Sequence, residues 1–236
     1  MYDKKAARHY EQGRALHQKG QLSDSERAYK KAIRISPEFV PAYNNLGNVL
    51  LDRGRLKQAT DTYRKALNLS PDHPMLLNNL GNALQQQGKN KKAVRWLNKA
   101  ISKNPNYADA YNNLGNALVG LRQLAEAVAS YDTAIELQPT SPEFHFNRGC
   151  ALNDLDKLEA AVGSYEHAIQ LRPDYAEAYY NCGIALKDLG RMEESIESWN
   201  KVIQLKPDST ETHRTLSTIK KYKVMDSQLH LMETLL

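Results

Sequence analysis

The sequence is poor in the residues and patterns that mark secreted, membrane-spanning and disulfide-linked proteins. Only Cys150 and Cys182 stand among 236 residues, which fits a reducing compartment and provides no disulfide framework. No run of about 18 apolar residues occurs, and the first residues, MYDKKAARHYEQG, lack the apolar stretch of a signal peptide. We therefore predict a cytoplasmic protein without membrane insertion.

Motifs for catalysis, cofactors and metals are also missing. The sequence contains no CxxC, HExxH, GxSxG or GxGxxG pattern. The segment 81–90, GNALQQQGKN, differs from a phosphate-binding loop because six residues separate its glycines and Asn90 replaces Ser or Thr. His9, His145 and His213 occupy a repeat position that holds tyrosine elsewhere, which favours packing over metal binding. We predict a protein that is not an enzyme and needs no cofactor or metal.

What the sequence does contain is a repeat of 34 residues. Glycine recurs with this step at Gly13, Gly47, Gly81, Gly115, Gly149 and Gly183. Proline recurs with the same step at Pro37, Pro71, Pro105, Pro139, Pro173 and Pro207. A fixed period of this size is typical of stacked structural units. The predicted units are 6–39, 40–73, 74–107, 108–141, 142–175 and 176–209.

Other positions of the unit alternate in size, as in closely packed helices. With glycine numbered as position 8, position 20 is small in all units: Ser25, Ala59, Ala93, Ala127, Ala161 and Ser195. Position 24 is bulky in all units: Tyr29, Tyr63, Leu97, Tyr131, Tyr165 and Trp199. Glycine at position 15 predicts the end of a first helix, but Arg122 and Asp156 replace it, so those two turns must differ or carry strain. The residues after the prolines are expected helix caps: Asp72, Asn106, Thr140, Asp174 and Asp208.

These columns resemble the tetratricopeptide repeat over residues 6–209. The resemblance implies an all-α fold, a right-handed α-solenoid of stacked antiparallel helix pairs. Helix A of each pair would line the concave side, and helix B the outer side. Residues 210–223 are expected to form a C-terminal capping helix, and 224–236 a further helix. Because that last stretch ends on two leucines without a cap, we expect that the chain was cut from a longer protein.

Asparagines gather on one stripe of helix A, opposite its apolar stripe. They are Asn44, Asn45, Asn48, Asn78, Asn79, Asn82, Asn112, Asn113, Asn116, Asn147 and Asn181. Each costs about 0.5 to 0.7 kcal/mol relative to alanine in a helix, so an offsetting function is expected. A carboxamide can donate to and accept from the main chain of an extended peptide. Arrays of the O-GlcNAc transferase and kinesin light chain type look similar, which implies peptide binding. The alternative is that the polar face was only duplicated, or that some amides bond to the next repeat.

The predicted peptide-binding groove also includes acidic and aromatic residues. Asp109, Glu143 and Glu177 share position 2, and Phe146 and Tyr180 offer apolar contacts. These residues predict that the carboxyl-terminal half of the groove favours basic segments. Replacing Asn79, Asn113 and Asn147 by alanine is expected to raise stability slightly and to weaken partner binding.

Charge changes sign along the chain. Residues 1–107 carry 20 basic and 8 acidic residues, and 108–236 carry 12 and 19. This asymmetry permits head-to-tail self-association that salt would dissolve. Nucleic-acid binding is disfavoured, because Trp96 is the sole aromatic residue among the basic residues of 89–103.

The first hypothesis is a non-enzymatic scaffold that binds a protein or peptide. The alternatives are a recognition module of a larger glycosyl- or sulfotransferase, and a self-assembling array.

Overall fold

Residues 3–219 are described in the computed structural model, and all their regular secondary structure is α-helical. The helices are α1 (Lys4–Gln18), α2 (Leu22–Ile35), α3 (Val40–Asp52), α4 (Leu56–Leu69), α5 (Pro74–Gln86), α6 (Asn90–Lys103), α7 (Ala108–Val119), α8 (Leu124–Leu137), α9 (Pro142–Asp154), α10 (Leu158–Leu171), α11 (Ala176–Asp188) and α12 (Met192–Leu205). Residues 210–219 are also helical. The predicted all-α fold is confirmed, while the predictions for 220–223 and 224–236 lie outside the described residues.

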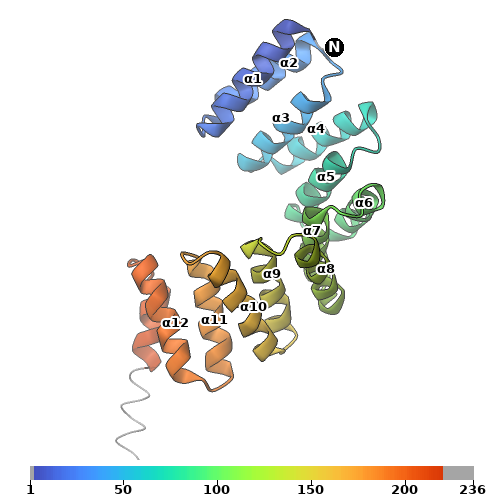
Figure 1. Ribbon diagram of the computed structural model, residues 1–236. Coiled ribbons are helices and arrows are strands. Elements are labelled where there is room, and N and C mark those ends of the chain that lie inside the picture. The colour runs from blue at the N-terminus through green and yellow to red at the C-terminus, as the bar shows by residue number, and fades with distance from the viewer. Residues whose placement is uncertain (1–2, 220–236) are drawn as a thin grey trace, which may run out of the picture. The chain divides into compact units, whose positions relative to one another are not determined.

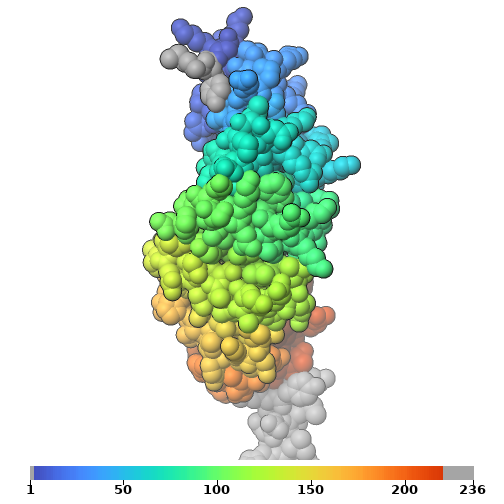
Figure 2. Space-filling view, turned by 90° about the vertical axis from the view of Figure 1, so that its right-hand side faces the viewer, coloured from blue at the N-terminus to red at the C-terminus, as the bar shows by residue number. Residues whose placement is uncertain are grey.

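The helices form antiparallel pairs, and each pair packs on the next within its unit (Figure 1). The chain divides into two compact units between Pro139 and Thr140. The first contains α1 to α8, and its early pairs follow one another as layers from blue to green in the space-filling view (Figure 2). The second contains α9 to α12 and the helix 210–219. The predicted solenoid of stacked helix pairs is present in each unit.

The A helices lie on the inner side of each unit. Neighbouring A helices contact each other directly, as α1 does with α3, α3 with α5, α5 with α7, and α9 with α11. Among the described helices, neighbouring B helices of one unit have no comparable contact. Helices that approach each other more closely lie at the smaller radius of a curved stack. The A helices are therefore on the inner side of the curvature, and the B helices are on the outer side.

The glycine of position 8 lets each bulky residue of position 24 lie directly on the backbone of helix A. A methyl group added at Gly115 would lie 2.5 Å from the Tyr131 ring, and one at Gly183 would lie 2.6 Å from Trp199. Position 20 is small for a related reason. The buried Ser195 hydroxyl donates to the Gly183 carbonyl oxygen at 2.7 Å. The size alternation of the repeat is thus the packing of one helix pair.

The turn between helix A and helix B has the same left-handed residue in all six pairs. The four glycines at this position have φ between 68° and 77°. Arg122 and Asp156 adopt φ of 61° and 59°, so the turn is the same as at the glycines. Their Cβ atoms make this left-handed conformation sterically unfavourable. Of the two outcomes expected from the sequence, a different turn or a strained one, the structure has the second at both residues.

This strain predicts opposite effects for two substitutions. Asp156→Gly should stabilise the second unit by about 0.5 to 1 kcal/mol, because glycine adopts positive φ without a Cβ clash. Gly54→Ala should destabilise the first unit by about 1 kcal/mol for the same reason, although its Cβ would meet no neighbour within 4 Å. Urea denaturation followed by circular dichroism measures both changes. Two shifts of the same sign would contradict the explanation.

The capping prediction for Asp72, Asn106, Thr140 and Asp174 is wrong, and the helix 210–219 likewise begins after Ser209 rather than directly after Asp208. The N-cap residues of the A helices from α3 to α11 are Phe39, His73, Tyr107, Ser141 and Tyr175, and none makes a side-chain capping bond. At two of these positions an aromatic ring packs instead, because Phe39 lies 5.0 Å from Tyr10 and Tyr175 lies 5.0 Å from Phe146 between ring centroids. Asp72 pairs with Lys99 and Lys103 at 3.2 and 2.9 Å.

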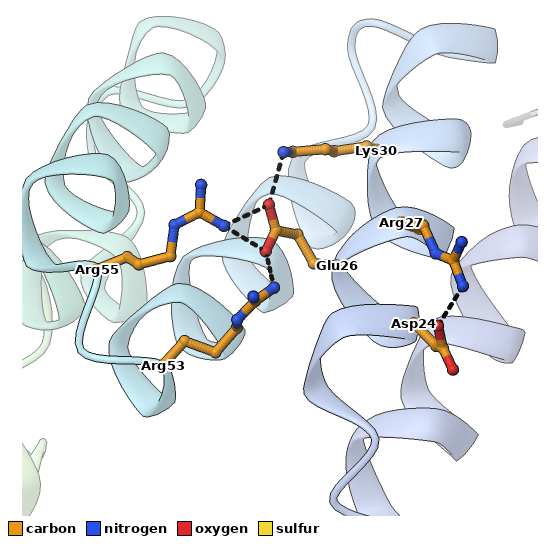
Figure 3. A network of polar contacts seen from close by, with 6 residues as sticks. All are labelled: Asp24, Glu26, Arg27, Lys30, Arg53 and Arg55. Carbon is orange, nitrogen blue, oxygen red and sulfur yellow. Dashed lines mark hydrogen bonds and ion pairs between the residues drawn. The ribbon is translucent and has the colours of Figure 1, made fainter.

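One buried carboxylate joins the first two repeats (Figure 3). Glu26 of α2 is 4% exposed, and it accepts hydrogen bonds from Lys30 at 2.6 Å, from Arg55 at 2.7 and 2.9 Å, and from Arg53. Burial raises the pKa of Glu26, but the Lys30 hydrogen bond and the charges of Lys30, Arg55 and Arg53 outweigh it and leave the pKa below its usual value. The cluster was not predicted from the sequence, because Arg53 and Arg55 belong to the next repeat.

Candidate functional site

The asparagines of neighbouring A helices bond to one another across the repeats. The Asn113 side chain of α7 donates to Asn78 Oδ1 of α5 at 2.9 Å. The Asn79 side chain of α5 donates in turn to Asn44 Oδ1 of α3 at 2.9 Å. These bonds join position 6 of one repeat to position 5 of the repeat before it. They are the inter-repeat amide bonds that the sequence left open as an alternative.

Bonds within each helix connect these links into one chain, here named the amide relay. Asn78 donates to Asn79 at 3.2 Å, Asn44 donates to Asn45 at 3.2 Å, and Asn45 donates to the Tyr10 hydroxyl at 3.1 Å. The relay therefore runs from Asn113 through Asn78, Asn79, Asn44 and Asn45 to Tyr10, and each carboxamide donates to the next member of this order. Asn44 and Asn113 each keep a second N–H beyond these bonds, whereas Asn79 uses its second N–H on Asn48 Oδ1 at 3.4 Å and Asn78 uses its own on the Tyr107 hydroxyl at 3.4 Å. The relay oxygens keep a second lone pair.

The amides of position 9 have a different role. Asn48 accepts from the Tyr63 hydroxyl at 2.6 Å, and Asn116 accepts from the Tyr131 hydroxyl at 2.7 Å. These contacts satisfy the hydroxyls of tyrosines that are at most 2% exposed. In the third repeat Leu97 replaces tyrosine, and Asn82 accepts only from Gln86 at 3.3 Å. Asn82 is thus the amide of this row that the packing requires least.

The inner face of the first unit is hollowed beside the relay. A hollow of about 1060 Å³ is lined by Tyr10, Asn44, Asn45, Pro41 and Met75, among other residues. Ten of the eleven predicted asparagines are half-buried, but Asn78 is buried at 4% exposure. A buried amide needs hydrogen-bond partners, and the Tyr107 hydroxyl accepts from Asn78 at 3.4 Å. Asn78 therefore supports the relay rather than facing the hollow.

The second unit has a smaller hollow, and its lining includes a thiol group. Its volume is about 160 Å³, and Cys150, Asn181 and Ile184 contribute to its lining. Asn181 donates to the Cys150 sulfur at 3.5 Å. Phe146 is half-buried and packs on Tyr175, with 5.0 Å between ring centroids.

The cysteine thiols and the ionisable groups around them do not form a reactive centre. Burial raises the pKa of Cys150, and burial raises that of Cys182 to about 11, so both stay protonated at neutral pH. Among residues 3–219, no cluster of three or more His, Cys, Asp or Glu side chains could hold a metal ion. In the same residues no helix has the length and apolarity to cross a membrane.

Two of the predicted groove carboxylates are already paired. Glu143 accepts from Arg172, and Glu177 accepts from Lys206 at 2.5 Å. Burial raises the pKa of Glu143, but the hydrogen bonds from Arg172 and Ser141 lower it more. The pKa of Glu177 is also lowered, and the hydrogen bond from Lys206 is the largest cause. Asp109 is exposed and makes no ion pair in the described part of the chain. The free negative charge of this row is therefore at Asp109.

Tyr180 is shared between the inner face and the packing of the last described helix. It belongs to a cluster with Trp199 and Leu216, of which Leu216 lies in the helix 210–219. Burial raises the pKa of Tyr180, and Glu211 raises it further. Tyr180 therefore offers less free surface than its sequence position suggests.

The relay gives Asn78→Ala an expected effect on stability opposite to that of helix propensity alone. Asn78→Ala gains about 0.5 kcal/mol of helix propensity but leaves the Asn113 side chain and the Tyr107 hydroxyl without this partner, so a net loss of about 1 to 2 kcal/mol is expected. Asn98→Ala, on the exposed surface of α6, should gain a few tenths of a kcal/mol. Chemical denaturation of both variants measures the difference. If both variants were stabilised equally, the relay would have no energetic role.

Tandem helix pairs with a polar, hollowed inner face define an α-solenoid. Sequence profiles described as tetratricopeptide repeat match 13–52, 39–103, 78–142, 130–163, 149–190 and 176–209. The chain belongs to the tetratricopeptide repeat family. Proteins of this family are generally non-catalytic modules that bind protein or peptide partners.

Solved structures with the same fold include three that cover most of this chain. YrrB, described as a tetratricopeptide repeat protein with an unusual peptide-binding site, is 27% identical, with a TM-score of 0.61 over 80% of this chain and 97% of its own. PilF of Pseudomonas aeruginosa is 21% identical, with a TM-score of 0.77 over 92% and 98%. PilW, a type IV pilus biogenesis factor, is 17% identical, with a TM-score of 0.84 over 91% and 99%. A comparison with curated proteins finds no match.

Proposed function

We propose that the inner face of the first unit binds an extended segment of a partner protein. The observation that carries this proposal is the hollow of about 1060 Å³ beside Asn44 and Asn45, where an apolar lining meets the relay amides. The peptide-binding site named for YrrB, at 27% identity, supports the same assignment. The chain would serve as a scaffold by itself or as the recognition module of a larger enzyme, such as a glycosyl- or sulfotransferase.

The relay prepares the amides for main-chain recognition. Its bonds hold the carboxamides of Asn44, Asn79 and their neighbours in fixed orientations before a ligand arrives. Binding then costs less side-chain entropy than it would with freely rotating amides. The second N–H of Asn44 and of Asn113 would donate to ligand carbonyls, and the second lone pair of relay oxygens such as that of Asn79 would accept from ligand N–H groups. Recognition of this kind depends little on the ligand side chains.

Apolar residues at the hollow supply the side-chain contacts. Leu69 and Met75 are 43% and 46% exposed, the two highest values among the large hydrophobic residues of 3–219. Both line the hollow together with Val40 and Pro41. We propose that one apolar side chain of the ligand occupies this part of the hollow, with its main chain along the relay.

The preference for basic ligand segments, which the sequence predicted for three carboxylates, is proposed here for Asp109 alone. We propose that a lysine or arginine of the ligand pairs with Asp109, whose charge has no cation beside it. At Glu143 and Glu177 a ligand cation would have to displace Arg172 or Lys206. The same pairing reduces the charge available for head-to-tail self-association, which stays a secondary proposal that sedimentation at low and high salt can test.

The peptide-binding proposal can be tested with a random library. Twelve-residue peptides on phage are selected on the wild-type protein, and synthetic copies are titrated against three proteins. Asn79→Ala/Asn82→Ala should bind at least tenfold more weakly than wild type, because it removes two inner-face amides. Asn98→Ala, an exposed amide of α6, should bind like wild type. Equal affinity of all three proteins for every selected peptide would refute the proposal.

A further inference from the structure

The outward side of α6 carries a basic surface with a hollow of its own. Lys92, Arg95, Trp96 and Lys99, here named the α6 patch, line a hollow of about 290 Å³. They follow one another at helical spacing, so they share one side of the helix. The helix Asn90–Lys103 contains no acidic residue. Because α6 is a B helix, the patch lies on the outer side of the first unit, away from the amide relay.

The charges of the patch are only partly neutralised. The Lys99 amine lies 3.2 Å from Asp72 and 6.0 Å from the Trp96 ring centroid. Lys92 and Arg95 are exposed and make no ion pair with any residue from 3 to 219. Lys99 is thus paired with Asp72 on one side of the hollow. On the other side, Lys92 and Arg95 present two unpaired positive charges beside the Trp96 ring.

Trp96 is not required by the fold. Its repeat position, position 23, holds a small residue in each of the other five units: Ala28, Thr62, Ser130, Ser164 and Ser198. Trp96 is half-buried, in contrast to Trp199, which packs inside the second unit at 1% exposure. Tryptophan and arginine together are the residues that most often dominate binding energy at protein interfaces. The other five repeats fold with a small residue at this position, so the large ring of Trp96 indicates a binding role.

We infer that the α6 patch binds an acidic segment of a partner protein. An apolar side chain of that segment would lie on the Trp96 ring, and its carboxylates would pair with Arg95 and Lys92, where arginine can bond a carboxylate with two N–H groups. A single aromatic ring gives no stacking row for successive bases, so an acidic peptide fits the patch better than a nucleic acid. This inference concerns a second surface and does not depend on the function proposed for the inner face.

The test is a display selection with subtraction. Random twelve-residue peptides on phage are selected on the wild-type protein and depleted on Trp96→Ser, which carries the residue of three sibling repeats. Synthetic copies of the remaining peptides are titrated while tryptophan emission is recorded. Trp199 is buried and stays in both proteins, so a change in emission reports on Trp96. Lys92→Ala/Arg95→Ala is a second variant that keeps the ring, and Asn98→Ala is the control on the same helix.

The expected peptides contain several Asp or Glu residues and at least one Leu, Ile or Phe. They should bind wild type and Asn98→Ala alike, bind Trp96→Ser and Lys92→Ala/Arg95→Ala at least tenfold more weakly, and lose affinity as sodium chloride rises. The inference would be overturned if no peptide depended on Trp96, or if the dependent peptides lacked acidic residues. It would also be overturned if a twelve-nucleotide oligothymidylate bound this patch more tightly than the peptides.

Discussion

Gly115→Ala is expected to destabilise the first unit by about 1 to 2 kcal/mol. The added methyl group would lie 2.5 and 2.7 Å from two ring atoms of Tyr131. The ring has little freedom to retreat, because Tyr131 is 2% exposed and its hydroxyl is held by Asn116 at 2.7 Å. Overpacking of this kind costs about 1 to 3 kcal/mol, and the better helix propensity of alanine returns up to about 1 kcal/mol.

A second glycine of the same chain serves as the control. Gly163 lies inside α10, and a methyl group added there would meet nothing within 4 Å. Gly163→Ala should therefore stabilise the protein by about 0.5 to 1 kcal/mol through helix propensity alone. Urea denaturation of both variants should show shifts of opposite sign. A stabilised Gly115→Ala protein would show that the close contact between position 8 and position 24 is not required.

Glu26→Gln is expected to cost about 2 to 3 kcal/mol. The substitution keeps the shape of the side chain but removes the charge that faces Lys30, Arg53 and Arg55. Removing one partner of a buried charge cluster is expensive, and the part exposure of the three cations moderates the cost here. Asp24→Asn is the matched control on the same helix (Figure 3). Its ion pair with Arg27 is solvent-exposed, so its loss should cost less than about 0.5 kcal/mol.

The Glu26 cluster also predicts a pH dependence. The pKa of Glu26 is lowered in the folded protein, so its contribution is complete above the ordinary value of 4.5 and is lost as pH falls through the lower folded value. The stability difference between wild type and Glu26→Gln should therefore be constant from pH 7 to about 5 and decrease below that range. Denaturation midpoints of the two proteins at several pH values measure it. A difference that grew on acidification would contradict the assigned sign.

The fold could be predicted from sequence because its signals are local and repeated. The step between Gly13, Gly47 and their counterparts established the period, and the glycines of the A-to-B turn marked where helix A ends. The turns at Arg122 and Asp156 could be predicted to differ or to carry strain, because the other four units define the expected backbone. The cap prediction failed at Asp72 because a polar residue after proline does not reveal that the next helix begins only at Pro74, two residues further on.

The candidate site was only partly readable from sequence. Helical periodicity placed the asparagines on one face, but a bond such as that from Asn79 to Asn44 depends on the separation and rotation of two helices. A usable signal did exist for position 9, because Asn48 and Asn116 occur in units with tyrosine at position 24. Glu26 could have been noticed as a charge at a mostly apolar position, but its arginine partners lie one repeat away.

The proposal that the inner-face amides hold the main chain of a partner is tested most directly by nuclear magnetic resonance. The protein is labelled with ¹⁵N only at asparagine and titrated with a peptide selected on the wild-type protein. We predict that the side-chain amide signals of Asn44, Asn79 and Asn82 shift progressively to saturation, while the signal of Asn98 on α6 does not move. Saturated binding that leaves those three signals unchanged would contradict the account.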